Sequence, residues 1–222
     1  MNEFTIVDLL RHGEPEGGQK FRGSIDDPLS VRGWEQMRAA VDDYREWEAI
    51  ISSPLIRCAA FAHELAERLD CPLKIVATFS EIGFGVWEGR SVAEVHETDP
   101  LALGQFWRDP ITYPIPGSEP VADFDRRISL AWDALLEEYR GRHVLLVTHG
   151  GVIRMVLRRL LDMPLRRIWR MEAPFASLSR MRVHRDPGSE PPFPHLSGPG
   201  SAAGRGSARP GLPQTLVPSP VV

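Results

Sequence analysis

The sequence has few cysteines, no long apolar run and no excess of basic residues. Cys58 and Cys71 are the only cysteines in 222 residues, too few for a disulfide framework, so we expect both to be reduced thiols. The lack of any apolar run of about 18 residues excludes a membrane-spanning helix, and no signal-peptide pattern precedes the first strand. A net charge of −4 argues against a general nucleic-acid-binding protein. We therefore expect a cytoplasmic protein that binds neither nucleic acid nor membrane.

Short metal-binding motifs are also missing from the sequence. It contains no HxH, HExxH or CxxC pattern, the spacings at which zinc and related metals are commonly held. His12 and His149 could be read as metal ligands, but the arginines close to them in the sequence would repel a cation. We therefore predict a protein without a metal and without a cofactor.

Strand and helix patterns alternate along the chain, which predicts an α/β fold with a mostly parallel central sheet flanked by helices. The predicted strands span residues 4–10, 49–53, 73–78, 143–148 and 176–184. The predicted helices span 31–47, 54–69, 120–140 and 151–161, the first of them capped by Ser30. The last strand alternates apolar and polar residues, as expected at the edge of a sheet. Residues 81–119 are predicted to hold short helices at most.

The composition changes after Asp186, which divides the chain into residues 1–186 and residues 187–222. The second segment is rich in Pro, Gly, Ser and Ala and nearly lacks aromatic residues. Such a segment buries too little apolar surface to offset the entropy of ordering it. We therefore predict one globular domain over residues 1–186, followed by a disordered tail.

Basic and imidazole side chains follow three of the predicted strands. Arg11 and His12 end the first strand, Arg57 lies in the first turn of the helix after the second, and His149 with Gly150 ends the strand at 143–148. Each alone has an ordinary explanation, as a surface pair, a solvated helix residue or a core histidine. If the strands are parallel, however, all of them meet at one edge of the sheet, beside two helix N-termini. That much positive character at one place predicts a phosphate site.

Phosphoryl transfer also needs a proton donor for the leaving alcohol, and Glu81 is the best candidate. It directly follows the strand at 73–78 and has apolar neighbours that could exclude water. The alternative is an exposed loop carboxylate without a chemical role.

Five segments, in this order, make the chain similar to the histidine phosphatase superfamily, in the branch related to phosphoglycerate mutase. They are LLRHGE (9–14), RGSIDDPLSVRGWEQM (22–37), SSPLIRC (52–58), EIGFGVWEG (81–89) and VTHGGVIR (147–154). The resemblance implies a three-layer α/β sandwich, and residues 1–186 would then form the histidine phosphatase domain. The stretches around 8–30 and 84–91 most resemble bacterial alpha-ribazole phosphatases, which act in cobalamin biosynthesis.

The resemblance also implies roles for individual residues. His12 matches the nucleophile that becomes phosphorylated, and Glu81 matches the acid that protonates the leaving group. The positions that match the phosphate pocket are Arg11, Gly23, Arg57, His149 and Gly150.

The expected activity is a metal-independent phosphomonoesterase that acts on a small phosphorylated metabolite, alpha-ribazole 5′-phosphate being the implied substrate. A phosphoglycerate mutase, or a phosphatase of another small metabolite, remains the alternative, although Pro15–Gly18 replace the mutases' asparagine-rich stretch. A phosphate-recognising scaffold without activity is the non-enzymatic alternative. A homodimer is compatible with these patterns.

Overall fold

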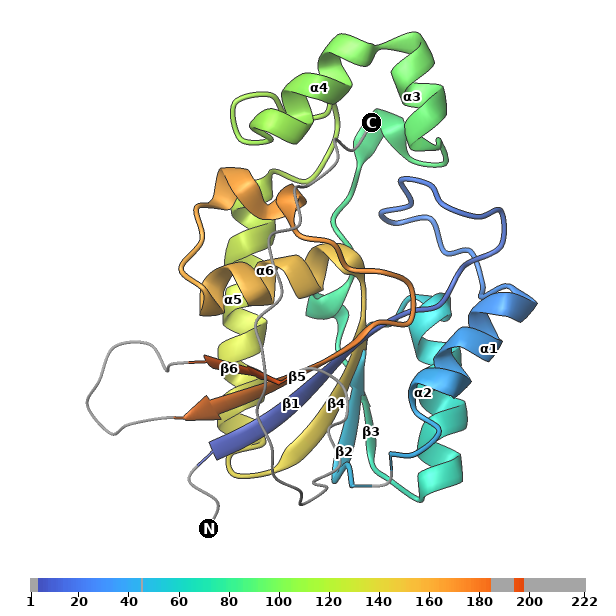
Figure 1. Ribbon diagram of the computed structural model, residues 1–222, viewed down its shortest axis with the longest axis vertical. Coiled ribbons are helices and arrows are strands. Elements are labelled where there is room, and N and C mark those ends of the chain that lie inside the picture. Colours follow the sequence, from blue (N-terminus) through green and yellow to red (C-terminus); the bar gives the residue numbers. More distant parts are fainter. Residues whose placement is uncertain (1–3, 45, 185–193, 198–222) are drawn as a thin grey trace, which may run out of the picture.

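A six-stranded mixed sheet forms the centre of the computed structural model, which describes residues 4–44, 46–184 and 194–197 (Figure 1). The strands are β1 (Phe4–Arg11), β2 (Ala49–Ser52), β3 (Leu73–Ile75), β4 (His143–Thr148), β5 (Leu178–His184) and β6 (Pro194–Ser197), in the order β3-β2-β4-β1-β5-β6. The first four in this order pair in parallel, whereas β5 pairs antiparallel with β1 and with β6. The predicted α/β fold with a mostly parallel sheet is confirmed.

Helices cover both faces of the sheet and make the three layers (Figure 1). The α-helices are α1 (Val31–Ala40), α2 (Ile56–Leu69), α3 (Val92–Thr98), α4 (Pro100–Arg108), α5 (Val121–Glu138) and α6 (Gly150–Leu160). Short 3₁₀ helices span Ala77–Phe79, Gly85–Trp87 and Leu165–Arg170. α1 and α2 cover one face, α5 and α6 the other, while α3 and α4 lie beyond the carboxyl ends of the parallel strands (Figure 1).

The alternation of side chains along β4 shows why both faces need a helical layer. Leu145 and Val147 pack in the core beneath α1 and α2, whereas Val144 and Leu146 pack beneath α5 and α6. All four side chains are fully buried. A strand that is apolar on both faces is stabilised only when both faces are covered.

The first helix is shorter than its sequence pattern predicts. Ser30 caps α1 as expected, its hydroxyl accepting a hydrogen bond from the Gly33 N–H at 3.0 Å. The helix ends at Ala40, however, so the predicted extension to Trp47 is wrong. The Trp47 indole instead donates to Asp8 at 2.8 Å, two residues before β2 begins. A tertiary hydrogen bond, rather than helical spacing, therefore buries this tryptophan.

Two further expectations are corrected by the structure, and a third is confirmed. β5 is not an edge strand, because β6 pairs with its second side. The predicted tail of residues 187–222 lies outside the described residues except for 194–197, and these four form β6 rather than a disordered segment. The prediction of short helices in the region 81–119 is confirmed, because α3 and α4 are 7 and 9 residues long and are capped by Ser91 and Asp99.

A charged side chain, that of Asp8, lies within β1 and is buried. Asp8 is fully buried and accepts hydrogen bonds from Trp47, from His143 Nε2 at 2.8 Å and from Arg180 Nε at 2.8 Å. Burial alone would raise the pKa of Asp8, but the hydrogen bonds from His143, Arg180 and Trp47 outweigh it and lower the pKa. This carboxylate joins β1, β4, β5 and the segment before β2.

Candidate active site

The strand ends that carry the predicted site are direct neighbours in the sheet. β4 lies between β1 and β2, with Arg11 opposite Thr148 and Ser52 opposite Val147. The His12 N–H continues the pairing by donating to the Thr148 carbonyl at 2.9 Å. The expectation that these three strands open at one edge of the sheet is therefore confirmed.

His12 lies at the centre of this edge and is only 4% exposed. Its Nδ1 lies 2.8 Å from the Gly13 carbonyl oxygen. Because a carbonyl oxygen can only accept, Nδ1 carries the proton and the neutral ring has its lone pair on Nε2. Burial, and then the charges of Arg11 and Arg57, lower the pKa of His12 well below its ordinary value. The ring is therefore held in the form in which Nε2 is a nucleophile.

Arg11 lies beside His12 and is fixed from two sides. Its guanidinium stacks over the Phe175 ring at 4.2 Å and donates from Nη1 to the Ala173 carbonyl. Burial lowers the pKa of Arg11 to about 10, so the group still carries its charge at neutral pH. Its Nε is buried and has no hydrogen-bond partner among the described residues. A buried donor of this kind is costly unless an anion accepts from it.

Arg57 approaches the same place from the first turn of α2 and is 1% exposed. It donates to the Ile25 carbonyl at 2.7 Å and to the Gly23 carbonyl at 3.1 Å. Gly23 has a φ of +51°, and a Cβ there would lie 1.9 Å from Glu88 Oε1. Glycine is therefore required at position 23 by the turn itself, whatever the loop binds.

His149 and Gly150 follow β4 at the start of α6. His149 is fully buried, and its Nε2 lies 2.7 Å from the Ser53 hydroxyl oxygen. The ring centroids of His149 and His12 are 5.2 Å apart. A Cβ at Gly150 would lie 2.8 Å from Arg154 Nη1 and 3.3 Å from Arg11 Nε. The glycine thus lets two guanidinium groups approach the helix N-terminus.

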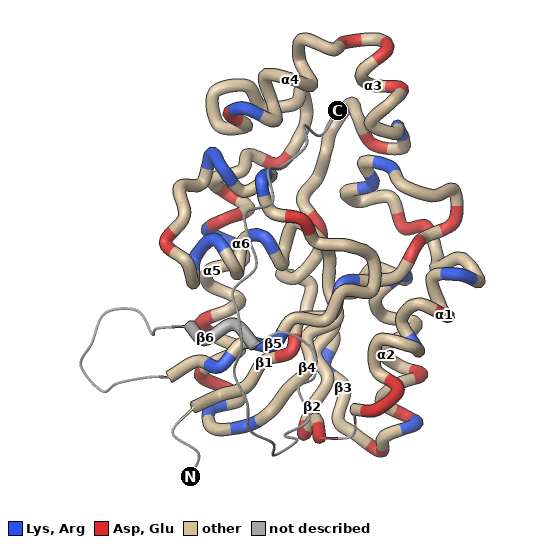
Figure 2. Tube along the Cα trace, viewed as in Figure 1, with Lys and Arg blue, Asp and Glu red and all other residues tan. Residues whose placement is uncertain are grey.

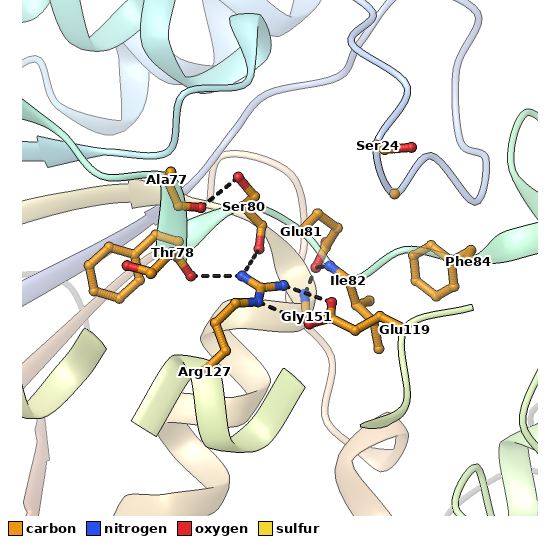
Figure 3. A network of polar contacts seen from close by, with 12 residues as sticks. Ser24, Ala77, Thr78, Ser80, Glu81, Ile82, Phe84, Glu119, Arg127 and Gly151 are labelled. Carbon is orange, nitrogen blue, oxygen red and sulfur yellow. Dashed lines mark hydrogen bonds and ion pairs between the residues drawn. The ribbon is translucent and has the colours of Figure 1, made fainter. Parts of the chain in front are cut away.

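Glu81 lies at the N-terminus of α6, as Figure 3 shows. Its Oε2 accepts from the Gly151 N–H at 3.1 Å, and its Oε1 accepts from the Ile82 N–H at 3.0 Å. A free helix N–H is a favourable partner for a carboxylate. The structure therefore places Glu81 in a partly buried position beside Gly151 and close to Arg154, rather than in an exposed loop, and its role as the acid stays a prediction.

Two arginines of the site were not singled out from the sequence, although both lie in segments that carry the resemblance. Arg22 is 5% exposed, donates to Asp27 at 2.9 Å, and contributes to lowering the pKa of His12. Arg154 donates from Nε to the Met171 carbonyl at 2.8 Å and stacks over Trp169. Burial lowers the pKa of both arginines. The signal that could have found Arg154 is its position one helical turn after Gly150.

The positive charge of the site is local rather than a property of the whole molecule. Basic and acidic residues are interspersed along the helices (Figure 2), and the chain carries a net charge of −4. At the edge of the sheet, by contrast, Arg11, Arg22 and Arg57 lie close enough to His12 to lower its pKa, and Arg154 lies near Arg11 at Gly150. This arrangement suits an anion with several oxygens, and a phosphoryl group has that chemistry.

The chain matches the family model of the histidine phosphatase superfamily (branch 1) over residues 7–189, and it belongs to this family. It is 33% identical over 187 residues to the bifunctional protein Rv2228c of Mycobacterium tuberculosis, covering 82% of this chain and 51% of that protein. It is 32% identical over 167 residues to a glucosyl-3-phosphoglycerate phosphatase of Mycolicibacterium vanbaalenii, covering 70% of this chain and 74% of the relative. The chain thus spans about half the length of the first of these relatives.

A solved structure of an alpha-ribazole phosphatase from Shigella flexneri has the same fold. It superimposes with a TM-score of 0.72 at 24% sequence identity, over 87% of this chain and 95% of that chain. At this identity the likeness concerns the fold alone. The three-layer fold that the sequence resemblance implied is therefore confirmed.

Within the part of the chain that the structure describes, no helix is long and apolar enough to cross a membrane. Groups of three or more His, Cys, Asp or Glu side chains placed to hold a metal ion are likewise absent from the described residues. Independence from metals and cofactors remains a prediction.

The buried histidines make the stability of the fold depend on pH. Burial and neighbouring charges lower the pKa of His12 and His149 well below the ordinary 6.5. Below about pH 6.5 both rings take up protons when the chain unfolds, whereas in the folded protein they stay neutral. The free energy of unfolding is therefore highest above about pH 6.5 and decreases as the pH falls towards the pKa values of the folded state. We expect urea denaturation to show a loss of up to about 1.4 kcal/mol per pH unit for each histidine.

The matched variant for this measurement is the double substitution His12→Gln with His149→Gln. It removes both titrating groups, so its free energy of unfolding should change much less between about pH 7 and about pH 5.5. An unaltered pH dependence in the double variant would contradict the assignment.

Proposed function

We propose that this protein is a metal-independent phosphomonoesterase that works through a phosphohistidine on His12. The observation that carries the proposal is the hydrogen bond between His12 Nδ1 and the Gly13 carbonyl, which assigns the lone pair to Nε2. In the first step Nε2 attacks phosphorus, the P–N bond forms and the bond from phosphorus to the leaving oxygen breaks. Arg11 and Arg57 hold the phosphoryl oxygens, on which negative charge gathers.

Glu81 is the proposed proton donor in that step and the proton acceptor in the next. Its carboxyl group gives a proton to the leaving oxygen, so that an alcohol departs. The resulting carboxylate then takes a proton from water, whose oxygen attacks phosphorus while the P–N bond breaks. Inorganic phosphate is released, and both Glu81 and His12 return to their starting forms.

Alpha-ribazole 5′-phosphate, a metabolite of cobalamin biosynthesis, is the proposed substrate. The sequence stretches around the RHGE and FGVWEG segments support it, and so does an aromatic cluster beside the site. Phe84 and Trp107 contact Trp169 with ring centroids 6.0 and 5.7 Å apart, and Trp169 lies under the Arg154 guanidinium at 5.5 Å. Trp107 is 36% exposed. The leaving alcohol, alpha-ribazole, carries a flat benzimidazole ring that such aromatic side chains can stack against.

A different small phosphorylated metabolite is the second candidate. The relative that is 32% identical is named for glucosyl-3-phosphoglycerate, and the same pocket chemistry would serve a phosphoglycerate mutase, which passes the phosphoryl group to a second hydroxyl instead of to water. The residues around the phosphate do not distinguish these cases, because the leaving group contacts other parts of the site.

Phosphate release from alpha-ribazole 5′-phosphate in excess EDTA tests the proposal. Glucosyl-3-phosphoglycerate and 3-phosphoglycerate are assayed in parallel, and His12→Ala is the control protein. We expect EDTA-resistant release that requires His12, fastest with alpha-ribazole 5′-phosphate. Faster release from another compound would transfer the substrate assignment to it, and loss of activity in EDTA would contradict metal independence. A lack of His12-dependent release from every compound would favour the scaffold alternative.

A further inference from the structure

Arg127 of α5 lies behind the acid-bearing segment and contacts it at several points (Figure 3). Its Nη1 donates to the Thr78 carbonyl at 2.7 Å and to the Ser80 carbonyl at 3.0 Å. Its Nε and Nη2 donate to the two carboxylate oxygens of Glu119 at 2.9 and 2.7 Å. One guanidinium group therefore joins the backbone just before Glu81 to the segment that precedes α5.

Glu119 completes the connection on the other side of Glu81. Its backbone N–H donates to the Gly83 carbonyl at 3.0 Å. Arg127 thus holds the carbonyls of Thr78 and Ser80, and Glu119 holds the carbonyl of Gly83. A further tether comes from the Thr148 hydroxyl, which donates to the Phe79 carbonyl at 3.2 Å. The backbone on both sides of Glu81 is fixed by residues distant in the sequence.

The position of the Glu81 carboxylate depends on this backbone. The hydrogen bonds that hold its oxygens come from the backbone N–H groups of Ile82 and Gly151. Because both donors are backbone groups, neither can follow the carboxylate by changing a side-chain rotamer if the segment shifts. A proton donor must lie within hydrogen-bond reach of the leaving oxygen, and a misplacement of about 1 Å can cost roughly 10²-fold in rate.

We propose that Arg127, paired with Glu119, is a positioning residue that holds Glu81 at the leaving oxygen. This inference rests on the proposed function, in which Glu81 is the proton donor. The pair is about a quarter exposed, with 25% and 24% of the side-chain surface accessible, and such pairs contribute little to global stability. Arg127 instead makes two hydrogen bonds to the backbone before Glu81 and two to the Glu119 carboxylate. The planar guanidinium of an arginine can orient both partners at once.

The test uses two substrates of nearly the same shape, phenyl phosphate and p-nitrophenyl phosphate. p-Nitrophenolate leaves readily as an anion, whereas phenolate is more basic and benefits more from a proton. We expect Arg127→Ala to lower kcat for phenyl phosphate by about 10- to 100-fold, and for p-nitrophenyl phosphate by less than about threefold. Glu81→Gln should show the same selectivity with a larger effect, of about 10²- to 10⁴-fold on phenyl phosphate.

Two further variants separate positioning from charge and from folding. Arg127→Lys keeps the charge but loses the fork, so it should remain selectively impaired. Arg126→Ala, at the neighbouring exposed position that pairs with Asp123, should behave as wild type. Glu119→Gln provides an independent test, because it keeps Arg127 but weakens the bidentate pair, and it should reproduce the selectivity in milder form. Circular dichroism and Tm show whether each variant is folded.

The outcomes distinguish this inference from the proposed function. If Glu81→Gln is selective, while the Arg127 and Glu119 variants slow both substrates equally or neither, the positioning role is overturned and the function stands. Full rescue by Arg127→Lys would replace positioning by a simple charge effect. If neither substrate is hydrolysed in a His12-dependent way, or if Glu81→Gln lacks selectivity, the proton-donor role fails and the inference fails with it.

Discussion

Replacement of His12 by alanine should abolish turnover, with a fall in kcat of roughly 10⁴-fold or more. Its Nδ1 is protonated by the bond to the Gly13 carbonyl, so Nε2 carries the lone pair beside Arg11 and Arg57. His149 is also a buried imidazole, but its Nε2 is already engaged with the Ser53 hydroxyl. Steady-state phosphate release measures the loss, and rapid quenching of wild type with substrate should trap a phosphohistidine that survives alkali and hydrolyses in acid.

The control for this substitution is His63→Ala, which removes an exposed histidine on α2. It should leave both turnover and the trapped intermediate unchanged. Because His12 contacts the Phe175 and His149 rings, the His12 variant is first shown to be folded by its circular dichroism spectrum. A folded His12→Ala protein with activity within about tenfold of wild type would contradict the mechanism.

The largest effect on stability is expected at Asp8, far from the chemistry. Asp8→Ala removes the carboxylate that accepts from Trp47, His143 and Arg180. These three donors then lose the acceptor that they share. The side chains of His143 and Arg180 are only 11% and 29% exposed, so water replaces the carboxylate incompletely. Breaking a buried pair from one side costs about 3–5 kcal/mol, and urea denaturation measures it as a lower midpoint.

Asp133→Ala is the matched comparison for Asp8. Asp133 also pairs with an arginine, Arg159, but its side chain is 53% exposed, so the change should cost less than about 1 kcal/mol. Similar losses in the two variants would show that the Asp8 network contributes no more than a surface pair.

Local sequence signals were sufficient for the sheet and for the principal candidate residues. The apolar run at 144–147 is as short as a strand and is followed by two glycines, which together predict a buried strand. Ser30 likewise capped its helix as its residue type predicts. Parallel order then placed Arg11, Arg57 and His149 at one edge, as the register of β1, β4 and β2 shows.

Contacts between distant segments decided what local patterns left undetermined. The apolar spacing of residues 34–47 fits a longer helix, but the bond from Trp47 to Asp8 draws that residue to the sheet. Likewise, nothing in the sequence of 194–197 predicts a strand, because an edge strand is stabilised by the hydrogen-bonding groups of its neighbour, here β5.

The sequence by itself determined the class of fold, the strand ends that carry the site, and the kinds of side chain that meet there. Only the tertiary structure decided the protonated nitrogen of His12, the membership of Arg22 and Arg154 in the pocket, and the attachment of the Glu81 segment to Arg127. The physical reason is the distance along the sequence over which each effect acts. Propensity and periodicity act within a few residues, whereas burial, charge and hydrogen bonding depend on which segments the fold brings into contact.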